Sequence, residues 1–185
     1  MSKAHLLAEL RDKIGFFKKK NASSLSYSQF KEGIPRPALI EVIGPAKVEW
    51  LLGFFRENPE LKVFWLEEKF NLLPLALFQH GVCLDQFWFA ETSDNLFKAA
   101  RQVLRSQAFE CLVLPGIFDD ELTYRTLQLF TEEANACTFI LSEEKHSAWP
   151  ISVQVKVDRS YEKESPAKSS GFSISLLRFK GGGFE

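Results

Sequence analysis

The sequence is poor in the residues that build metal centres and disulfide frameworks. Its 185 residues include 3 cysteines and 3 histidines, and no cysteine or histidine pair has the spacing of a zinc site. All three cysteines lie in apolar stretches. We therefore expect Cys83, Cys111 and Cys137 to be buried thiols in a reducing compartment.

Long hydrophobic runs and an excess of one charge are also missing. No apolar stretch is long enough to span a bilayer, and the first residues lack the apolar core of a signal peptide. The 23 Lys and Arg residues nearly balance the 24 Asp and Glu residues, for a net charge of -1. No overall field therefore attracts nucleic acid or an anionic membrane. We expect a cytoplasmic protein without a metal site or membrane contact.

The remaining composition is that of one globular domain. The chain is 45% hydrophobic and 25% charged, which is typical of globular proteins. A domain of this length buries roughly 70% of its unfolded surface, so it needs no disulfide or metal for stability.

Residues 38–54 form the stretch around which the chain is organised. Its apolar, β-branched start predicts a buried strand, Gly44 breaks that strand, and a helical pattern follows. This order is that of a phosphate-binding P-loop, which needs Gly-x-x-x-x-Gly-Lys-Ser/Thr. In the register that starts at Gly44, the second glycine, the lysine and the hydroxyl positions carry Glu49, Trp50 and Leu51. From these residues alone, we favour an ordinary strand–helix turn over a P-loop that has lost its ligands.

Strands and helices then alternate along the chain. The apolar runs predict strands over residues 39–43, 62–66, 84–89, 111–114 and 137–141. The helical patterns cover residues 48–57, 71–80 and 119–134. A further helix is capped by residues 92–94 and extends to about residue 107. This alternation predicts a three-layer α/β/α fold with a mainly parallel sheet.

The pattern changes near Trp149. Residues 151–157 alternate between apolar and polar side chains. Further along, Phe172, Ile174 and Leu176 alternate with polar or other neighbours, and Arg178 is next in this alternation. We expect a terminal antiparallel hairpin at the edge of the sheet. The tail that begins with Arg178, Phe179 and Lys180 contains three glycines, so it is not expected to form a regular element.

The N-terminal segment has its own pattern. Residues 3–20 predict a helix with an apolar stripe that contains Leu6, Leu10, Ile14 and Phe17. This helix packs either on its own core or on a partner or second copy, which would give a homo-oligomer. Residues 21–31 are polar and serine-rich and predict a linker. The chain therefore divides into an N-terminal helix and linker, residues 1–32, and a core with its tail, residues 33–185.

With this order of elements, the chain resembles the core of the RecA ATPase. The resemblance rests on residues 33–45, 81–87, 111–114, 153–159 and 175–180. It implies a RecA-like fold and favours a degenerate P-loop over an ordinary turn. Among RecA-like proteins the chain is most similar to the ImuA family, accessory proteins of bacterial mutagenic translesion cassettes, which share the broken P-loop and a tail shaped like residues 178–182. The SulA family of SOS cell-division inhibitors is the close rival.

Departures from RecA indicate lost ligands. The strand that ends in a metal-binding aspartate in RecA ends here in Pro115. The two DNA-binding loops of RecA correspond to residues 117–120 and 142–150, which are short and have no basic run. The resemblance therefore implies a core without nucleotide cofactor, metal or direct nucleic-acid binding.

The resemblance implies a non-catalytic protein-interaction module. An ImuA-like accessory factor in SOS-induced translesion synthesis would bind an ImuB-type partner, which resembles a Y-family polymerase, and RecA. A SulA-like inhibitor acting on FtsZ is the alternative. A third interpretation is a weak nucleotide-handling enzyme that uses Glu67 or Glu68.

Partner contacts are expected at both ends of the chain. Phe179 and Phe184 are candidate exposed anchors, and Arg178 and Lys180 are candidate donors to a carboxylate. The N-terminal stripe described above is the second candidate surface.

Overall fold

The computed structural model describes residues 23–69, 72, 74–92, 95–160 and 171–180. Its main sheet has seven strands in the order β5-β4-β6-β7-β3-β8-β9. Their bounds are β3 (Ala38–Ile43), β4 (Val63–Glu67), β5 (Phe87–Glu91), β6 (Cys111–Pro115), β7 (Cys137–Ser142), β8 (Val153–Ser160) and β9 (Gly171–Phe179). All neighbouring strands are parallel except β8 and β9, which form an antiparallel hairpin.

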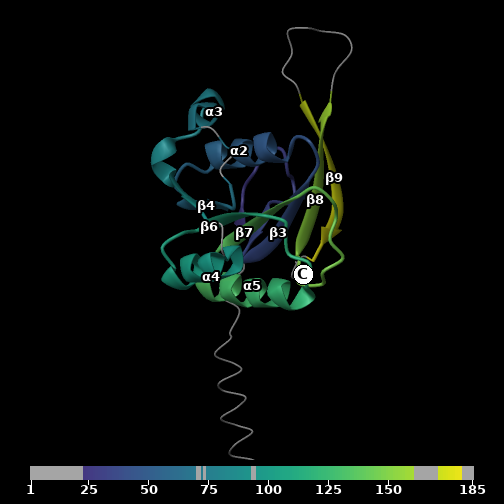
Figure 1. Ribbon diagram of the computed structural model, residues 1–185. Helices are drawn as coiled ribbons and strands as arrows, with labels where there is room; N and C mark the ends of the chain where they lie inside the picture. Colours follow the sequence, from purple (N-terminus) through teal and green to yellow (C-terminus); the bar gives the residue numbers. More distant parts are fainter. Residues whose placement is uncertain (1–22, 70–71, 73, 93–94, 161–170, 181–185) are drawn as a thin grey trace, which may run out of the picture.

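Helices cover both faces of this sheet (Figure 1). Helices α2 (Lys47–Glu57) and α3 (Pro74–Gln79) lie on one face, and α4 (Leu96–Ser106) and α5 (Glu121–Ala134) lie on the other. The predicted three-layer α/β/α fold with a mainly parallel sheet and a C-terminal antiparallel hairpin is confirmed. No described helix has both the length and the hydropathy to cross a membrane.

Two hydrophobic clusters hold the layers together. One contains Trp50, Phe54 and Phe55 of α2, all without exposed surface, and packs on one face of the sheet. The other lies beneath α4 and α5, where Leu104 and Leu127 are buried. Every residue of β3 is buried, because this central strand has strands on both edges and helices on both faces.

Several element boundaries differ from the predictions. Residues 84–86 form a short 3-10 helix, η1 (Leu84–Gln86), so the strand predicted from residue 84 begins only at Phe87. Helix α4 is capped by Asn95, whose side chain accepts a 2.7 Å hydrogen bond from the Lys98 amide, rather than by residues 92–94. Helix α5 is capped in the same way by Asp120, and its hydrogen bonds with Thr123 lower the pKa of this carboxyl group.

The linker predicted over residues 21–31 is wrong for residues 23–31, which belong to the folded core. Strands β1 (Ser23–Leu25) and β2 (Ile34–Arg36) pair antiparallel. Between them Tyr27 is buried, and its hydroxyl donates a 2.7 Å hydrogen bond to the carbonyl of Trp50. Gly53 makes room for this contact, because a Cβ there would lie 2.5 Å from the Tyr27 hydroxyl oxygen. The division into residues 1–32 and 33–185 stays a prediction, since residues 1–22 lie outside the described part.

The predicted burial is confirmed for two of the three cysteines. Cys111 and Cys137 are buried opposite each other on β6 and β7. Burial, followed by the neighbouring Cys137, raises the pKa of the Cys111 thiol well above its ordinary value. Cys83 is exposed, so the prediction that it is buried is wrong. The reason is that Cys83 precedes the η1 turn instead of lying in a strand.

A β-bulge changes the register of the terminal hairpin. Val155 pairs with Leu176 and Gln154 with Arg178, which leaves Leu177 as the extra residue. One extra residue reverses the faces of everything that follows it. Phe179 therefore packs against the cluster that contains α2, with its ring centroid 6.5 Å from that of Phe30.

Arg178 and Phe179 thus belong to β9, and the prediction that this part of the tail has no regular structure is wrong. The unbroken alternation predicted for residues 172–178 would have placed Arg178 on the core face and Phe179 outside. The observed order is the reverse, because the bulge inserts Leu177 between the two parts of the strand.

We expect Phe179→Ala to lower the free energy of unfolding by about 1–3 kcal/mol, because a half-buried ring leaves a cavity in the core. Leu177→Ala is the matched control. It removes a bulge side chain that is 40% exposed, and should change stability by less than about 0.5 kcal/mol. Urea unfolding followed by circular dichroism measures both values. Equal values for the two variants would contradict the packing of Phe179.

Candidate functional site

The turn between β3 and α2 stands where a P-loop would bind phosphate. It has three residues, 44–46, and is packed against β8. Gly44 has a φ of +102°, and a Cβ at this position would lie 2.4 Å from the carbonyl oxygen of Val157. The amide of Ala46 donates a 3.3 Å hydrogen bond to the same oxygen. A phosphate cradle needs several backbone N–H groups that point at the ligand, and this turn directs the Ala46 amide to protein.

The side chains after the turn are also engaged. The ammonium group of Lys47 donates to the carbonyl oxygen of Ser142, at 3.1 Å, and to the carboxylate of Glu143, at 2.6 Å. Glu49 forms an ion pair with Arg159 of β8. The neighbouring Trp50 and Leu51 have no exposed surface, so the positions of the lysine and hydroxyl of a P-loop are part of the core.

The end of β6 offers no carboxylate for a metal. Pro115 is its last residue, and the amide of Gly116 donates a 2.8 Å hydrogen bond to the carbonyl of Leu141 on β7. A Cβ at Gly116 would lie 2.1 Å from the Ser142 hydroxyl oxygen, so only glycine fits this approach. Within the described ranges, no group of three His, Cys, Asp or Glu side chains is arranged to bind a metal ion.

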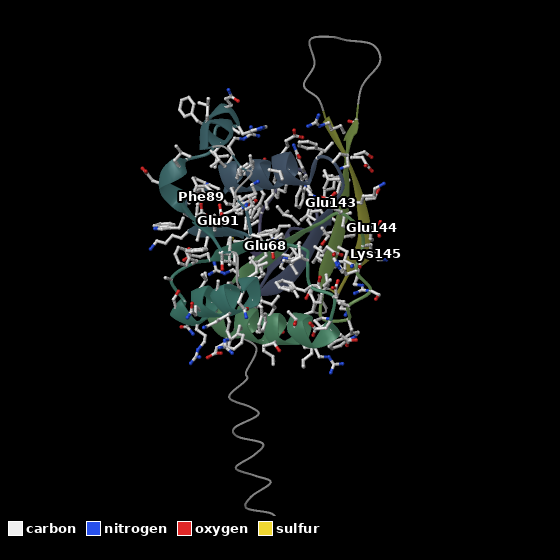
Figure 2. All side chains as sticks on the ribbon, viewed as in Figure 1. Glu68, Phe89, Glu91, Glu143, Glu144 and Lys145 are labelled. Carbon is white, nitrogen blue, oxygen red and sulfur yellow. The ribbon has the colours of Figure 1, made fainter. Side chains whose placement is uncertain are left out.

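The two glutamates considered for an enzymatic role lie at the end of β4. Glu67 accepts a 2.8 Å hydrogen bond from the indole of Trp65. Glu68 is exposed. Figure 2 shows Glu68 between two groups of labelled residues, with Phe89 and Glu91 on one side and the 143–145 segment on the other.

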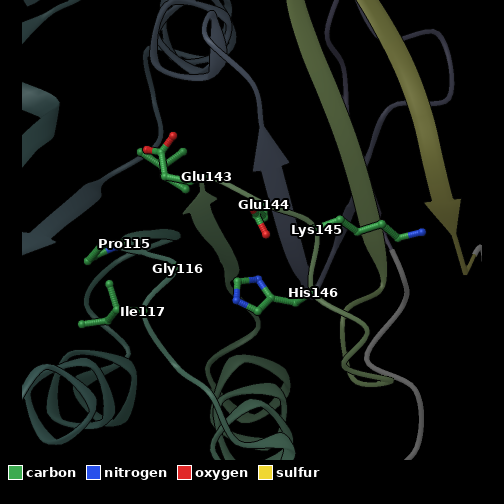
Figure 3. A pocket seen from close by; sticks show the side chains of 8 residues that line it. Pro115, Gly116, Ile117, Glu143, Glu144, Lys145 and His146 are labelled. Atoms are coloured by element: carbon green, nitrogen blue, oxygen red, sulfur yellow. The ribbon is translucent and has the colours of Figure 1, made fainter.

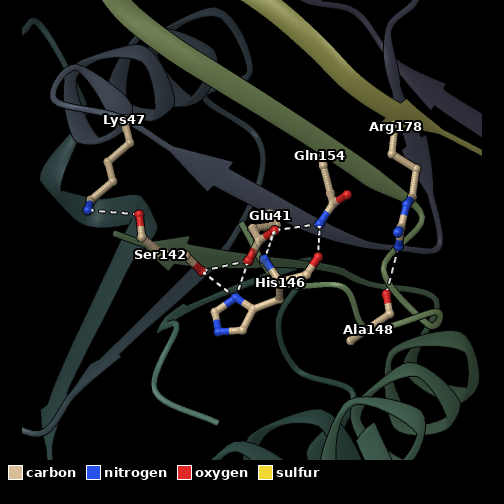
Figure 4. A network of polar contacts seen from close by, with 7 residues as sticks. All are labelled: Glu41, Lys47, Ser142, His146, Ala148, Gln154 and Arg178. Carbon is tan, nitrogen blue, oxygen red and sulfur yellow. Dashed lines mark hydrogen bonds and ion pairs between the residues drawn. The ribbon is translucent and has the colours of Figure 1, made fainter. Parts of the chain in front are cut away.

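A buried carboxylate that the sequence analysis did not identify lies at the centre of the sheet. Glu41 of β3 has no exposed surface. Its oxygens accept hydrogen bonds from the Ser142 hydroxyl at 2.8 Å, the Gln154 side-chain amide at 2.6 Å and the His146 backbone amide at 3.2 Å. The Nδ1 atom of the His146 ring also lies in hydrogen-bond contact with it (Figure 4).

These donors come from the two strands beside β3 and from the segment that connects them. Ser142 ends β7, Gln154 lies in β8, and His146 lies between. Gln154 also donates a 2.6 Å hydrogen bond to the His146 carbonyl. A carboxylate buried without such donors would cost several kcal/mol, so Glu41 ties the 143–152 connection to the sheet.

The sequence does contain a sign of this site, because Glu41 is the one charged residue in the apolar run that predicts the strand. A charged residue in a buried strand needs partners. Its partners could not be identified from the sequence, since they lie 101 to 113 residues further along the chain.

A pocket of about 380 Å³ lies beside this network, at the ends of β6 and β7. Its lining includes Pro115, Ile117, Leu141, Glu143, Glu144 and His146. Figure 3 shows the His146 ring facing Gly116 and Ile117, whereas the Lys145 side chain extends away. The carboxyl ends of parallel strands are where α/β proteins bind ligands.

The polar groups near the pocket contact one another, and the Ser142 hydroxyl lies 3.3 Å from the Nδ1 atom of the His146 ring. The Ser142 hydroxyl and the Nδ1 atom of His146 both bond to Glu41. The ring of Tyr124 packs 5.5 Å from that of His146, and its hydroxyl has no hydrogen-bond partner among the described residues. Burial, followed by the charge of Glu41, raises the pKa of Tyr124.

Two of the predicted partner-binding residues, Arg178 and Lys180, lie next to the connection between β7 and β8, residues 143–152. The guanidinium group of Arg178 donates a 2.7 Å hydrogen bond to the carbonyl of Ala148 (Figure 4). The backbone amide of Lys180 donates to the carbonyl of Ser152 at 2.8 Å. Phe179 lies on the opposite face, in the core. The remaining predicted residues lie outside the described ranges: Leu6, Leu10, Ile14, Phe17 and Phe184.

The comparisons with known proteins support the fold. No protein-family model and no curated protein matches this sequence. Among solved structures, the chain is similar to a KaiC-like protein of the hyperthermophilic archaeon Pyrococcus horikoshii, with a TM-score of 0.60. The fold is RecA-like. The similarity covers 86% of this chain and 89% of the archaeal chain, and the two sequences are 10% identical, so it describes the fold alone.

Replacing the buried carboxylate should destabilise the whole domain. In Glu41→Gln the amide nitrogen would face groups that are themselves donors, so we expect a loss of about 2–4 kcal/mol in the free energy of unfolding. Glu144→Gln removes an exposed carboxylate from the same region and should change stability by less than about 0.5 kcal/mol. Urea unfolding of both variants tests this, and a Glu41 variant as stable as the Glu144 variant would contradict it.

Proposed function

We propose that this protein is a non-catalytic RecA-like interaction module, an ImuA-like accessory factor in SOS-induced, error-prone translesion synthesis. It would act in the cytoplasm by binding an ImuB-type partner, related to Y-family polymerases, and RecA. The observation that carries this proposal is the closed turn between β3 and α2 in a RecA-like sheet. The ImuA-like role comes from the resemblance of the sequence.

The closed turn supports a function without nucleotide. A triphosphate at this turn would displace the Ala46 amide from Val157 and would meet the carboxylate of Glu49. Two anionic groups in contact repel each other. The turn offers no free lysine to offset this repulsion, because Lys47 bonds to Ser142 and Glu143. One fold can host many unrelated functions, so a RecA-like sheet without a phosphate site is compatible with a role in binding other proteins.

The surface that would bind a partner is the end of β9. Arg178 and Lys180 present cations beside the connection between β7 and β8. The N-terminal stripe of Leu6, Leu10, Ile14 and Phe17 would supply a second contact, with the same partner or with another copy of the chain. Phe184 would add an apolar group to the tail.

Calorimetric titration with ATP and magnesium should give no saturable heat at millimolar nucleotide, because the turn offers neither free amides nor a lysine. The Glu49→Ala variant, which removes the repelling carboxylate, should behave in the same way. A micromolar site in the native chain that disappears in the Glu49 variant would overturn the interpretation that the chain functions without nucleotide.

Capture experiments test the partner. We expect the purified full chain to retain an ImuB-type protein and RecA, and Lys180→Glu to weaken this capture by about tenfold through charge reversal at the tail. Lys62→Glu reverses an exposed lysine that lies just before β4, and should leave capture unchanged. Capture of FtsZ in place of the ImuB-type protein would establish the SulA-like alternative.

A further inference from the structure

The connection between β7 and β8 exposes a tryptophan. Trp149 is 62% exposed, although an indole ring gains much from burial and is enriched at the centres of protein interfaces. The ammonium group of Lys180 lies 4.3 Å from the centroid of its ring. This arrangement is a cation–π contact on an open surface.

The backbone on both sides of Trp149 is fixed by hydrogen bonds. Arg178 donates to the carbonyl of Ala148, the Lys180 ammonium donates to the carbonyl of Trp149, and the Ser152 amide donates to the carbonyl of Leu39 at 2.9 Å. The start of the same segment is tied to Glu41 through His146. A side chain presented from a fixed backbone loses less conformational entropy on binding.

The two cations beside Trp149 have no carboxylate to balance them in the part of the chain that the structure describes. Their hydrogen bonds go to backbone carbonyls instead. Desolvation lowers the pKa of Lys180, and repulsion from the nearby positive charge of Arg178 lowers it further. An external carboxylate would relieve this repulsion and would form charge-assisted hydrogen bonds.

We propose that Trp149, Arg178 and Lys180 form one docking surface for an acidic segment of a partner protein, an extended stretch in which carboxylates alternate with apolar side chains. The indole takes an apolar side chain of that segment, and the two cations take its carboxylates. This inference rests on the proposed function and refines it, because the aromatic anchor of the tail surface becomes Trp149 in place of Phe179.

A synthetic probe isolates the chemistry of this surface. The full chain is titrated into a fluorescent peptide of alternating glutamate and leucine, and into its lysine–leucine counterpart, at low salt, with anisotropy as the readout. We expect only the acidic peptide to bind. Trp149→Ala and Lys180→Glu should each weaken binding by about tenfold or more. Thermal unfolding shows whether each variant folds. If Trp149→Ala does not fold, the result with Lys180→Glu decides the test.

Trp88→Ala is the matched control. Trp88 is the other exposed tryptophan among the described residues, 42% exposed, and it lies on β5, at the opposite edge of the sheet from β9. Removing it should leave the affinity for the acidic peptide unchanged. Equal binding of the basic peptide, no binding of the acidic one at about 1 mM, or equal effects of the two tryptophan variants would overturn the proposal. So would a dimer that requires Trp149, which would make a second copy the occupant.

The two proposals fail separately. If the acidic peptide binds as expected but no ImuB-type protein or RecA is captured, the docking surface stands and the proposed function fails. If those proteins are captured equally by the native chain and by Trp149→Ala, the function stands and the docking surface fails.

Discussion

A carboxylate in the middle of a sheet must have donors, and this requirement arranges much of the molecule. Glu41 is buried between the strands that flank β3, where an unpaired charge would cost a large part of the few kcal/mol by which a domain is stable. Its donors are supplied by Ser142, Gln154 and His146. The chain between β7 and β8 must therefore follow one path, and that path determines where the pocket and Trp149 lie.

The RecA-like shape does not need a nucleotide. The parallel order of the strands requires crossover helices on both faces, and each helix buries an apolar face against the sheet. The turn that binds phosphate in a P-loop contributes little to these contacts, since only Ala46 of its three residues belongs to the core cluster. The fold therefore does not depend on a phosphate site at that turn, and here Gly44 approaches Val157 so closely that protein fills the space. Fold and ligand site are physically separate in this architecture.

The parts of this fold that could be predicted are those that depend on local periodicity. Apolar runs located the parallel strands, and helical patterns located the helices between them, to within a few residues. The failures depend on distant contacts. Tyr27 lies in a polar stretch but packs on Trp50, and no local pattern reveals that contact. The partners of Glu41 are also distant in the sequence. A charged residue in an apolar run therefore indicates a site, but the run does not reveal which residues surround it. The bulge at Leu177 has no sequence signal, because leucine fits either face of a strand.

That single bulge decides which chemistry the end of β9 presents. Without it, Phe179 would face solvent and Arg178 would face the core, and the tail would offer an aromatic group of its own. With it, the ring stabilises the core and the guanidinium group reaches the carbonyl of Ala148. The described end of β9 then supplies charge through Arg178 and Lys180, and the apolar group beside these cations comes from the neighbouring connection, where Trp149 lies under Lys180. Because Glu41 fixes one end of that connection and Arg178 the other, the aromatic group and the cations are already in place before a partner arrives.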